Sequence, residues 1–415
     1  MALTIRSIDE LMSGARYPNC PVCGTSEESA RENVKAGCPH CYEHFAHIFD
    51  PHIERLHTIK MPAASEAFSE MLRDYPEYLD IAVSSRVRLA RNSAEVPFPG
   101  AMTGEQELLL FEDLRGYLSG VGGGGLFEVV DLDSFKHSSI FGPASLLEKH
   151  LISKELLGKE GSKRGAAISP AQDISIMINE EDHLRIQAMG QGLSLLSCLE
   201  KAEAAEKLLS EHVNFAKSEK LGIITRCPTN LGTGLRASVM LHLPAHTDSG
   251  QINGLAVDLG KAGYTIRGFY GEGTKALGRL YQVSNQQTTG LEVRQIVENL
   301  NALVLKIIIR EREIQRLLDS NHPGYIEDQV HRAYGLLTHA RRITGDEAMQ
   351  LLSLARVGVS IGQLDIRLNN LNGLIHSIQP NTLCLAAGRK LDDNERDHIR
   401  AALIRNTLED SDDET

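Results

Sequence analysis

Apolar residues along this chain follow two different periods, and the change between them indicates a mixture of strands and helices. Short runs rich in Ile, Val, Leu and Met have the length and composition of buried strands. Longer segments repeat apolar residues every three or four positions, which places these residues on one face of a helix. The strand-like runs include ISIMIN, GIITRC and SVMLHLP, and helical segments between them include LLLFEDLRGYL and AAEKLLSEHVNFA. We therefore expect a mixed domain built on a sheet.

Helical spacing continues through the last part of the chain. Its apolar residues predict one long helix that ends before Pro323, since proline interrupts helical hydrogen bonding. The first apolar positions of this helix are Ile296, Leu300, Leu303 and Ile307. Farther on, Thr344 and Glu347 have capping-box spacing, and Asp392 or Asp393 is placed to cap the run that ends in RAALIR. We expect the acidic tail LEDSDDET to be disordered.

The composition is that of a soluble globular protein long enough for two or three domains. The 415 residues carry a formal net charge of -12, which disfavours attraction to nucleic acid or to anionic membranes. The first residues lack a basic start followed by an apolar core, and the apolar stretch LNALVLKIII is interrupted by Lys306. We therefore expect a cytoplasmic protein that binds neither nucleic acid nor a membrane.

Four of the seven cysteines form two Cys-x-x-Cys pairs near the N-terminus, with fourteen residues between the pairs. A tetrahedral zinc ion needs four such ligands, and a site closed by four thiolates stabilises a fold rather than catalysing a reaction. We expect structural zinc, rather than unliganded thiols or a redox pair, at Cys20, Cys23, Cys38 and Cys41. Nearby histidines are alternative ligands, although we favour surface positions for His40, His44, His47, His52 and His57.

Composition divides the chain into three parts. Residues 1–60 hold the cysteine pairs and form a small zinc-binding module, followed by the linker-like MPAAS. Residues 66–318 contain the alternating strands and helices, and residues 323–415 form a helical C-terminal domain with the acidic tail. The glycine run at 120–125 lacks a following Gly-Lys-Ser/Thr, so we interpret it as a flexible turn rather than a phosphate-binding loop.

Four blocks of the central segment place arginines beside loop-forming residues: SSRVRLARN, NEEDHLRIQAM, CPTNLGTGLRASVM and RGFYGEGTKALGRLYQVSN. Any one of these arginines is explained as well by a solvated surface. Together, at strand ends beside Gly and Asn, they suit the bidentate binding of phosphate oxygens. Two of the blocks add a carboxylate. The four blocks are therefore candidates for a phosphate-binding site.

These blocks resemble the catalytic domain of the phosphagen (guanidino) kinases, and EKHLIS, SIMINEEDHLRIQ and CPTNLGTGLRASVM are most similar to the McsB family of protein-arginine kinases. The resemblance runs from about residue 66 to the C-terminus. The segment GCPHCYEHFAHIFDPHIERLHTIKMP is similar to the second zinc unit of McsA, the activator of those kinases. The resemblance implies an α+β fold with an antiparallel sheet flanked by helices. It also implies transfer of a phosphoryl group from ATP, with Mg²⁺, to arginine side chains of proteins.

The functional residues of the family carry over position by position. Glu181 and Glu272 match the carboxylates that hold the substrate guanidinium, Cys227 matches the cysteine beside it, and His150 matches the position that packs on adenine. The arginines that match those holding the phosphates are Arg86, Arg88, Arg185, Arg236 and Arg267. A guanidinium is a poor nucleophile while protonated, so carboxylates must orient it and accept its proton. Cys227 either attracts the guanidinium as a thiolate or only packs.

Two features favour an arginine presented by a protein. Met240 stands where small-molecule guanidino kinases carry a histidine, as it does in the protein-arginine branch. We also expect no room for the helical N-terminal domain with which small-molecule members close over their substrate. The alternatives are a free-arginine kinase and a catalytically dead adaptor that binds phosphoarginine. The intact set of catalytic positions argues against the adaptor.

The C-terminal domain contains the segment RDxxRA, formed by Arg396, Asp397, Arg400 and Ala401. The two arginines are four residues apart, so they share one face of a helix, and by themselves they are an ordinary solvated face. In the protein-arginine kinase family a matching segment binds phosphoarginine away from the active site. The resemblance therefore implies a regulatory phosphoarginine site. We further expect a Clp-type ATPase or protease as a partner and a homo-oligomer, dimeric or larger.

Overall fold

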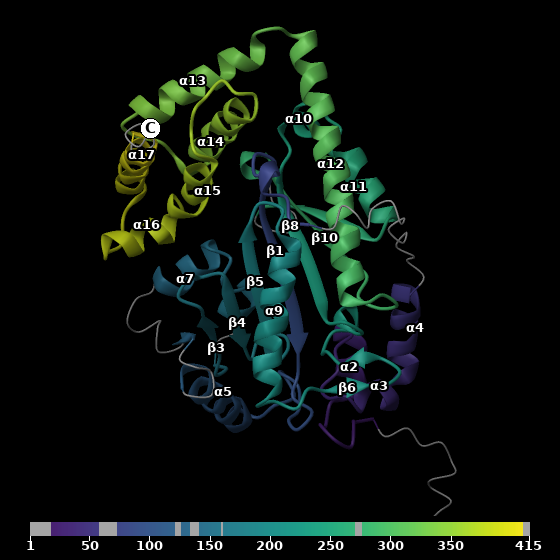
Figure 1. Cartoon of the computed structure of the whole chain (residues 1–415). Coiled ribbons are helices and arrows are strands. Elements are labelled where there is room, and N and C mark those ends of the chain that lie inside the picture. The colour runs from purple at the N-terminus through teal and green to yellow at the C-terminus, as the bar shows by residue number, and fades with distance from the viewer. Residues whose placement is uncertain are drawn as a thin grey trace, which may run out of the picture.

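An antiparallel sheet forms the centre of the molecule (Figure 1). The computed structural model describes residues 18–57, 73–120, 126–132, 141–158, 161–269 and 276–409. Neighbouring strands are all antiparallel, in the order β2-β3-β4-β5-β1-β8-β10-β9. The strands of this sheet are β1 (Ala82–Arg91), β2 (Glu128–Asp131), β3 (Gly165–Ile168), β4 (Ile174–Ile178), β5 (Leu184–Gln191), β8 (Leu235–His242), β9 (Tyr264–Gly268) and β10 (Leu280–Asn285). A separate short pair consists of β6 (Lys217–Ser218) and β7 (Gly222–Ile223).

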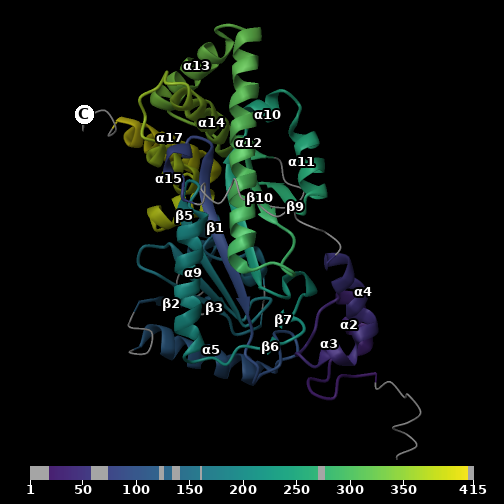
Figure 2. The ribbon, with the colours of Figure 1, turned by 45° about the vertical axis from the view of Figure 1, so that its right-hand side comes forward.

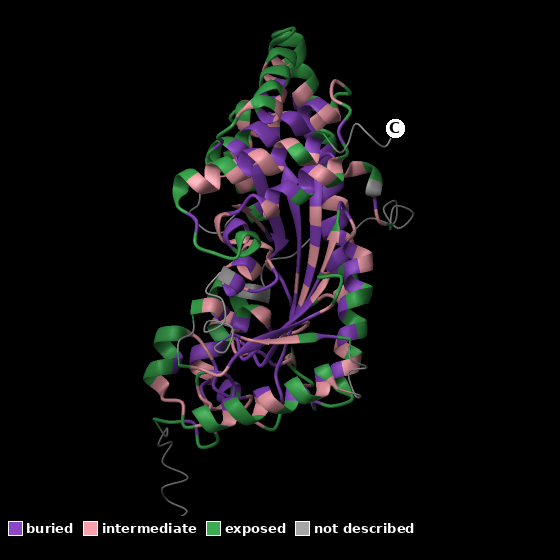
Figure 3. Ribbon diagram, turned by 90° about the vertical axis from the view of Figure 1, so that its left-hand side faces the viewer, coloured by how far each residue is buried: buried purple, intermediate pink, exposed green. Residues whose placement is uncertain are grey.

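One face of the sheet is apolar and lies beneath three helices. Successive residues of a strand point to opposite faces, so Val87 and Leu89 of β1 enter this core while Arg86 and Arg88 point to the other side. The buried residues of the sheet and the inner stripes of the covering helices form one continuous layer (Figure 3). The three helices are α5 (Gly104–Ser119), α9 (Leu195–Ser210) and α12 (Val293–Asn321).

Most of the predicted elements are confirmed. ISIMIN lies in β4 and SVMLHLP in β8, and α12 ends before Pro323. The hydroxyl of Thr344 accepts a hydrogen bond from the Glu347 amide at 3.3 Å, which forms the expected cap of α14 (Gly345–Ser360). Asp392 is the residue that caps α17 (Asp393–Glu409), because its Oδ1 accepts a hydrogen bond from the Glu395 amide at 2.8 Å.

The strand expected for GIITRC is largely wrong, since only its first two residues belong to a strand, β7. The residues that follow turn toward the N-terminal module instead. There the carbonyl oxygen of Thr225 accepts a hydrogen bond from the Tyr42 hydroxyl at 2.9 Å. The carbonyl oxygen of Arg226 accepts one from the Ala36 amide at 2.8 Å. These backbone groups are satisfied by the module and so are not available to a sheet.

The N-terminal module lies beside the β6–β7 end of the catalytic domain (Figure 2). Its apolar residues do not form a separate core. Phe45 and Phe49 belong to the same buried cluster as Phe98, Ile224 and Leu231 of the catalytic domain. The module therefore shares its apolar core with the catalytic domain, as expected for so few residues. Its helices are α2 (Glu27–Asn33), α3 (Cys41–His44) and α4 (Ala46–His57).

The C-terminal helical domain packs on the opposite end of the sheet (Figure 1). Met240, Phe269 and Leu280 of the catalytic domain share its core. Arg356 of α14 is buried and donates a hydrogen bond from Nε to the carbonyl oxygen of Asp80 at 2.8 Å, which ties the two domains together. The other helices of the domain are α13 (Tyr325–His339), α15 (Leu368–Ser377) and α16 (Pro380–Ala387). Shorter connecting helices are α7 (Phe141–Glu148), α8 (Lys154–Gly158), α10 (Pro244–Asp248), α11 (Ile252–Lys261), η2 (Pro76–Tyr78), η3 (Pro228–Asn230) and η4 (Leu277–Arg279).

Four predicted features lie outside the described residues: the glycine run beyond position 120, the linker MPAAS, Glu272 and the last six residues of the acidic tail. Within the described ranges, no helix is long and apolar enough to cross a membrane.

Candidate active site

The polar face of the sheet gathers the arginines that the sequence singled out. In β1, Arg86 and Arg88 are two residues apart and therefore share this face. Arg88 pairs with Arg236 of β8, and Ala90, the next position of β1 on the same face, pairs with Arg185 of β5. Residues that pair directly in an antiparallel sheet project from the same face. Four arginines from three adjacent strands therefore converge on one surface.

Arg267 extends this arginine surface to the edge of the sheet. It lies on β9 and pairs with Gln282 of β10, which pairs in turn with Met240 of β8. Met240 pairs with Ser84, two positions before Arg86 on the same face of β1. The register thus places all five predicted phosphate-binding arginines on one face.

Burial and mutual repulsion disfavour the charged forms of Arg86 and Arg88. Burial lowers the pKa of Arg86 to about 10, and Arg185 and Arg236 contribute to the same shift. Burial also lowers the pKa of Arg88, with the neighbouring guanidinium groups as further causes. Among the described residues, neither Nε atom has a hydrogen-bond partner although both are buried. Buried donors rarely go unsatisfied, so this surface fits an anion with several oxygens, such as a polyphosphate.

Two consecutive glutamates border the arginines and differ in exposure. Glu180 is buried, and its Oε1 accepts hydrogen bonds from Arg185 at 2.8 Å and from the Ser153 hydroxyl at 2.7 Å. The Glu181 side chain is 20% exposed, and its Oε2 lies 3.8 Å from the guanidinium group of Arg185. Glu180 is therefore a fixed counter-charge within the protein. Glu181 is the more exposed of the two carboxylates.

Cys227 stands at the start of η3, with its Sγ 3.0 Å from the Thr229 hydroxyl. Burial raises the pKa of the Cys227 thiol, and the negative charge of Glu181 raises it further. Hydrogen bonding to Thr229 and the positive charge of Lys35 act in the opposite direction. Without an added cation beside it, Cys227 is therefore a neutral thiol at pH 7.

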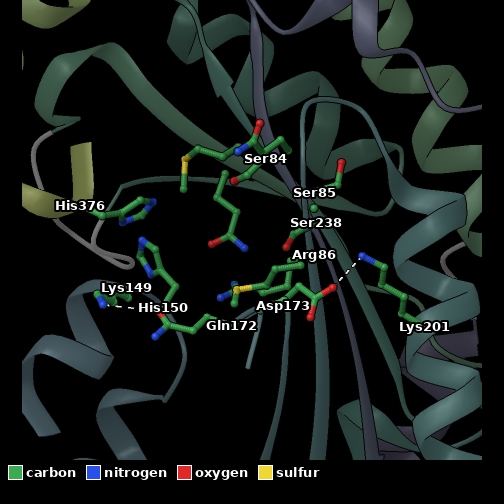
Figure 4. Close-up of a pocket in the computed structure, with 16 residues that line it drawn as sticks. Ser84, Ser85, Arg86, Lys149, His150, Gln172, Asp173, Lys201, Ser238 and His376 are labelled. Carbon is green, nitrogen blue, oxygen red and sulfur yellow. Dashed lines mark hydrogen bonds and ion pairs between the residues drawn. The ribbon is translucent and has the colours of Figure 1, made fainter. Parts of the chain in front are cut away.

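A cavity of about 420 Å³ adjoins Arg86, and His150 and His376 line its far side (Figure 4). The His150 ring lies 5.1 Å from Phe269 and 5.6 Å from His376 between centroids. Burial lowers the pKa of His150 to about 3, helped by His376 and two arginines. The ring is thus neutral, and its buried Nε2 has no hydrogen-bond partner within the described structure. A flat, nitrogen-bearing ligand such as a nucleobase fits this environment.

The four N-terminal cysteines converge as the sequence predicted. Their Sγ atoms all lie within 4.8 Å of one another. Three of the separations are 3.7 Å for Cys20 and Cys38, 3.5 Å for Cys23 and Cys41, and 3.8 Å for Cys38 and Cys41. Zinc lies about 2.3 Å from each thiolate sulfur, so a tetrahedral site has sulfur-to-sulfur edges of about 3.8 Å. The cluster therefore has the size of a zinc site, and His40, His44, His47 and His52 are not needed to complete it.

The two arginines of RDxxRA differ in their surroundings. Arg400 is buried and donates hydrogen bonds to the carbonyl oxygens of Ile343 at 2.8 Å and Ile378 at 3.1 Å, and to Asp397 at 2.7 Å. The Arg396 side chain is 27% exposed. Arg400 therefore holds parts of the helical domain together, whereas Arg396 is partly exposed and pairs with Asp393.

Sequence reasoning missed three residues that border the site. His376 reaches the cavity from the C-terminal domain, and Lys35 reaches Glu181 from the N-terminal module. Glu148 joins the C-terminal domain to the loop of His150, because its carboxylate accepts hydrogen bonds from the Asn381 amide at 3.0 Å and the Thr382 amide at 2.8 Å. These contacts arise from domain packing, and no local pattern in the sequence marks them.

Three family models match successive parts of the chain. Residues 125–314 match the family model described as the ATP:guanido phosphotransferase C-terminal catalytic domain. Residues 323–415 match the protein-arginine kinase McsB C-terminal domain, and residues 18–61 match the McsA central zinc-finger domain. One chain thus combines segments similar to a kinase and to a zinc-binding protein.

Solved structures with this fold include guanidino kinases. The chain is similar to a lombricine kinase, with a TM-score of 0.61 and 22% identity over 72% of this chain and 89% of the other. It is also similar to the duplicated taurocyamine kinase from Schistosoma mansoni, with a TM-score of 0.59 and 27% identity over 67% of this chain and 40% of the other. The predicted α+β phosphagen-kinase fold is confirmed.

Curated relatives match over most of the chain. A protein-arginine kinase from Symbiobacterium thermophilum is 42% identical over 83% of this chain and 98% of its own length. Another from Geobacillus thermodenitrificans is 43% identical over 79% of this chain and 90% of its own length. The chain therefore belongs to the family of protein-arginine kinases.

Proposed function

We propose that this protein transfers the γ-phosphoryl group of ATP to the guanidinium groups of arginine side chains in proteins. The observation that carries this proposal is the position of Glu181 at the border of the arginine surface, within 3.8 Å of Arg185. Phosphoryl transfer needs positive charge around the equatorial oxygens and an aligned acceptor. A solvent-accessible carboxylate beside the arginines supplies a binding point for a cationic acceptor.

The nucleotide would span the arginine surface and the neighbouring cavity. The unpartnered Nε atoms of Arg86 and Arg88 are suited to phosphate oxygens, with Arg185, Arg236 and Arg267 adding positive charge. The adenine would lie against the neutral ring of His150. Mg²⁺, bound with the phosphates, would neutralise part of their charge during transfer.

The acceptor arginine would bind on the side of Glu181, with Glu272 as the second carboxylate. A carboxylate fixes the guanidinium by charge-assisted hydrogen bonds and accepts its proton as the N–P bond forms and the bond from phosphorus to ADP breaks. The guanidinium would also favour the thiolate of Cys227, since an adjacent positive charge lowers the pKa of a thiol. In this proposal Cys227 is a thiolate only while the acceptor guanidinium lies beside it.

The finer biological setting is part of the same proposal. The modified proteins would be directed to a Clp-type ATPase or protease, and the enzyme would act in the cytoplasm as a homo-oligomer. The accessible Arg396 of RDxxRA would bind phosphoarginine at a distance from the catalytic arginines and so let the product regulate the enzyme. The four cysteines would hold one structural zinc ion, since their spacing matches a tetrahedral site.

Replacement of Glu181 by Gln tests the acceptor assignment. The amide keeps the shape but loses the charge that orients and deprotonates the guanidinium, so we expect kcat to fall about 10²- to 10⁴-fold with ATP affinity nearly unchanged. Because both glutamates hold one guanidinium, adding Glu272→Gln should cost less than the product of the two single effects. Phosphoarginine formed on casein, measured by mass spectrometry, is the readout. Near-normal turnover of Glu181→Gln would show that Glu181 is not the catalytic carboxylate.

Arg88 and Arg91 of β1 should respond to replacement in opposite ways. Arg88→Met removes repulsion from the arginine surface, so we expect the ligand-free protein to melt about 2–4 °C higher. ATP binding should weaken about 10- to 100-fold with the loss of charged hydrogen bonds. Arg91, whose Nε bonds to Glu206 at 2.7 Å, is the matched control, because Arg91→Met should lower the melting temperature. Calorimetry with and without ATP measures both effects, and equal destabilisation by the two changes would contradict this account.

The zinc assignment predicts about one zinc ion per chain by metal analysis under reducing conditions. Cys38→Ser should abolish metal binding and unfold the N-terminal module, because zinc contributes on the order of 10 kcal/mol to small modules of this kind. Hydrogen exchange should then rise in α3 and α4 while α9 and α12 keep their protection. A metal-free wild-type protein that retains the protected module would refute the assignment.

The regulatory proposal predicts a separation between Arg396 and Arg400. Arg396→Ala should abolish binding of free phosphoarginine, measured by calorimetry, without changing the thermal midpoint. Arg400→Met should instead lower the free energy of unfolding by about 3 kcal/mol, since it leaves buried carbonyl groups and Asp397 without their donor. If Arg396→Ala responds to phosphoarginine like the unaltered protein, RDxxRA is not the regulatory site.

A further inference from the structure

The N-terminal module places one of its own cations on the acceptor carboxylate. The Nζ atom of Lys35 lies 2.7 Å from Oε1 of Glu181. Arg185 approaches only the other oxygen, at 3.8 Å. Oε1 is thus the oxygen of Glu181 in close contact with a cation, and that cation comes from outside the catalytic domain.

The backbone beside Lys35 is fixed, so this contact is not that of a mobile surface lysine. The amide of Ala36 donates a hydrogen bond to the carbonyl oxygen of Arg226 at 2.8 Å, and Ala36 is buried. The carbonyl oxygen of Gly37 accepts one from the amide of Phe98 at 2.8 Å. The next residue, Cys38, belongs to the cysteine cluster. Two backbone hydrogen bonds therefore anchor the module to the catalytic domain directly after Lys35.

We propose that Lys35 is a resident cation of the acceptor site, which an incoming arginine must displace from Glu181. This inference rests on the proposed role of Glu181 in binding the acceptor. A lysine ammonium and an arginine guanidinium compete for the same carboxylate, but the guanidinium forms two parallel hydrogen bonds where the ammonium forms one. Lys35 therefore sets how tightly arginine binds.

The exposure of the pair makes this exchange feasible. The Lys35 side chain is 36% exposed and the Glu181 side chain is 20% exposed, so water can reach both groups when they separate. The four-carbon stem of lysine can rotate away while its backbone remains anchored. Glu181 also stands between two other acidic residues, Glu180 and Asp182. While no acceptor is bound, the ammonium group of Lys35 beside Glu181 reduces the repulsion among these three carboxylates.

The test is the affinity for a minimal acceptor, N-acetyl-arginine N-methylamide, measured by calorimetry in the presence of ADP and Mg²⁺. Lys35→Met keeps the stem but removes the competing charge. We expect Kd to fall about two- to fivefold, the range set by one partly exposed ion pair, and KM for the acceptor to fall by the same factor. Lys35→Arg retains a cation and should give no gain in affinity.

Two controls assign any change to Glu181. Arg31 is a cation of the same module that pairs with Glu27 and is 63% exposed, so Arg31→Met should leave Kd unchanged. In the Glu181→Gln background Lys35→Met should also leave Kd unchanged, because the competitor acts through that carboxylate.

The outcomes separate this inference from the proposed function. If Lys35→Met lowers kcat and leaves the acceptor Kd unchanged, Lys35 positions Glu181 and the competition is wrong. An unchanged Kd with an unchanged kcat overturns it equally. If Glu181→Gln retains near-normal turnover, the catalytic role of Glu181 fails first, and the inference about Lys35 fails with it.

Discussion

The central constraint on this structure is that the sheet must hold several arginine charges close together on one of its faces. Arg86, Arg88, Arg185 and Arg236 project from three adjacent strands, and burial deprives two of them of the water that would screen their repulsion. Such a surface is unfavourable until an anion binds. The apolar core beneath α5, α9 and α12 holds the strands in register, and that core compensates for the unfavourable face. The buried guanidinium groups that would favour a bound polyphosphate are thus also unfavourable to the empty site.

The two flanking parts of the chain complete the site from opposite ends. The C-terminal domain contributes His376 to the cavity and is fastened next to His150 through the carboxylate of Glu148. The N-terminal module contributes Lys35 to Glu181. In the proposed function, the nucleotide side would therefore depend on the packing of the helical domain, and the acceptor side on the packing of the N-terminal module.

The fold was predicted well from the sequence, for reasons that are largely local, and the five arginines that were singled out lie on one face of the sheet. Alternation along β1 separates Val87 and Leu89 from the arginines, and capping residues such as Thr344 mark helix ends without reference to the rest of the fold. The roles of the arginines came from resemblance, because one arginine on a strand looks like any solvated residue. GIITRC was misassigned, and Lys35 was not identified, for a common reason. Both depend on contact between parts of the chain that are distant in sequence.

The four-cysteine cluster helps to explain how so small a module can position a side chain accurately. About forty residues cannot bury enough apolar surface to fix their own shape, so such modules need a metal or a partner surface. This module has both a four-cysteine cluster and an apolar interface that includes Phe45 and Phe98. Cys38 of the cluster lies three residues after Lys35, and the backbone hydrogen bonds to the catalytic domain begin one residue after it. The chain is therefore constrained directly after Lys35, the lysine that reaches Glu181, which is the arrangement expected if the contact with the acceptor site is a function of the module.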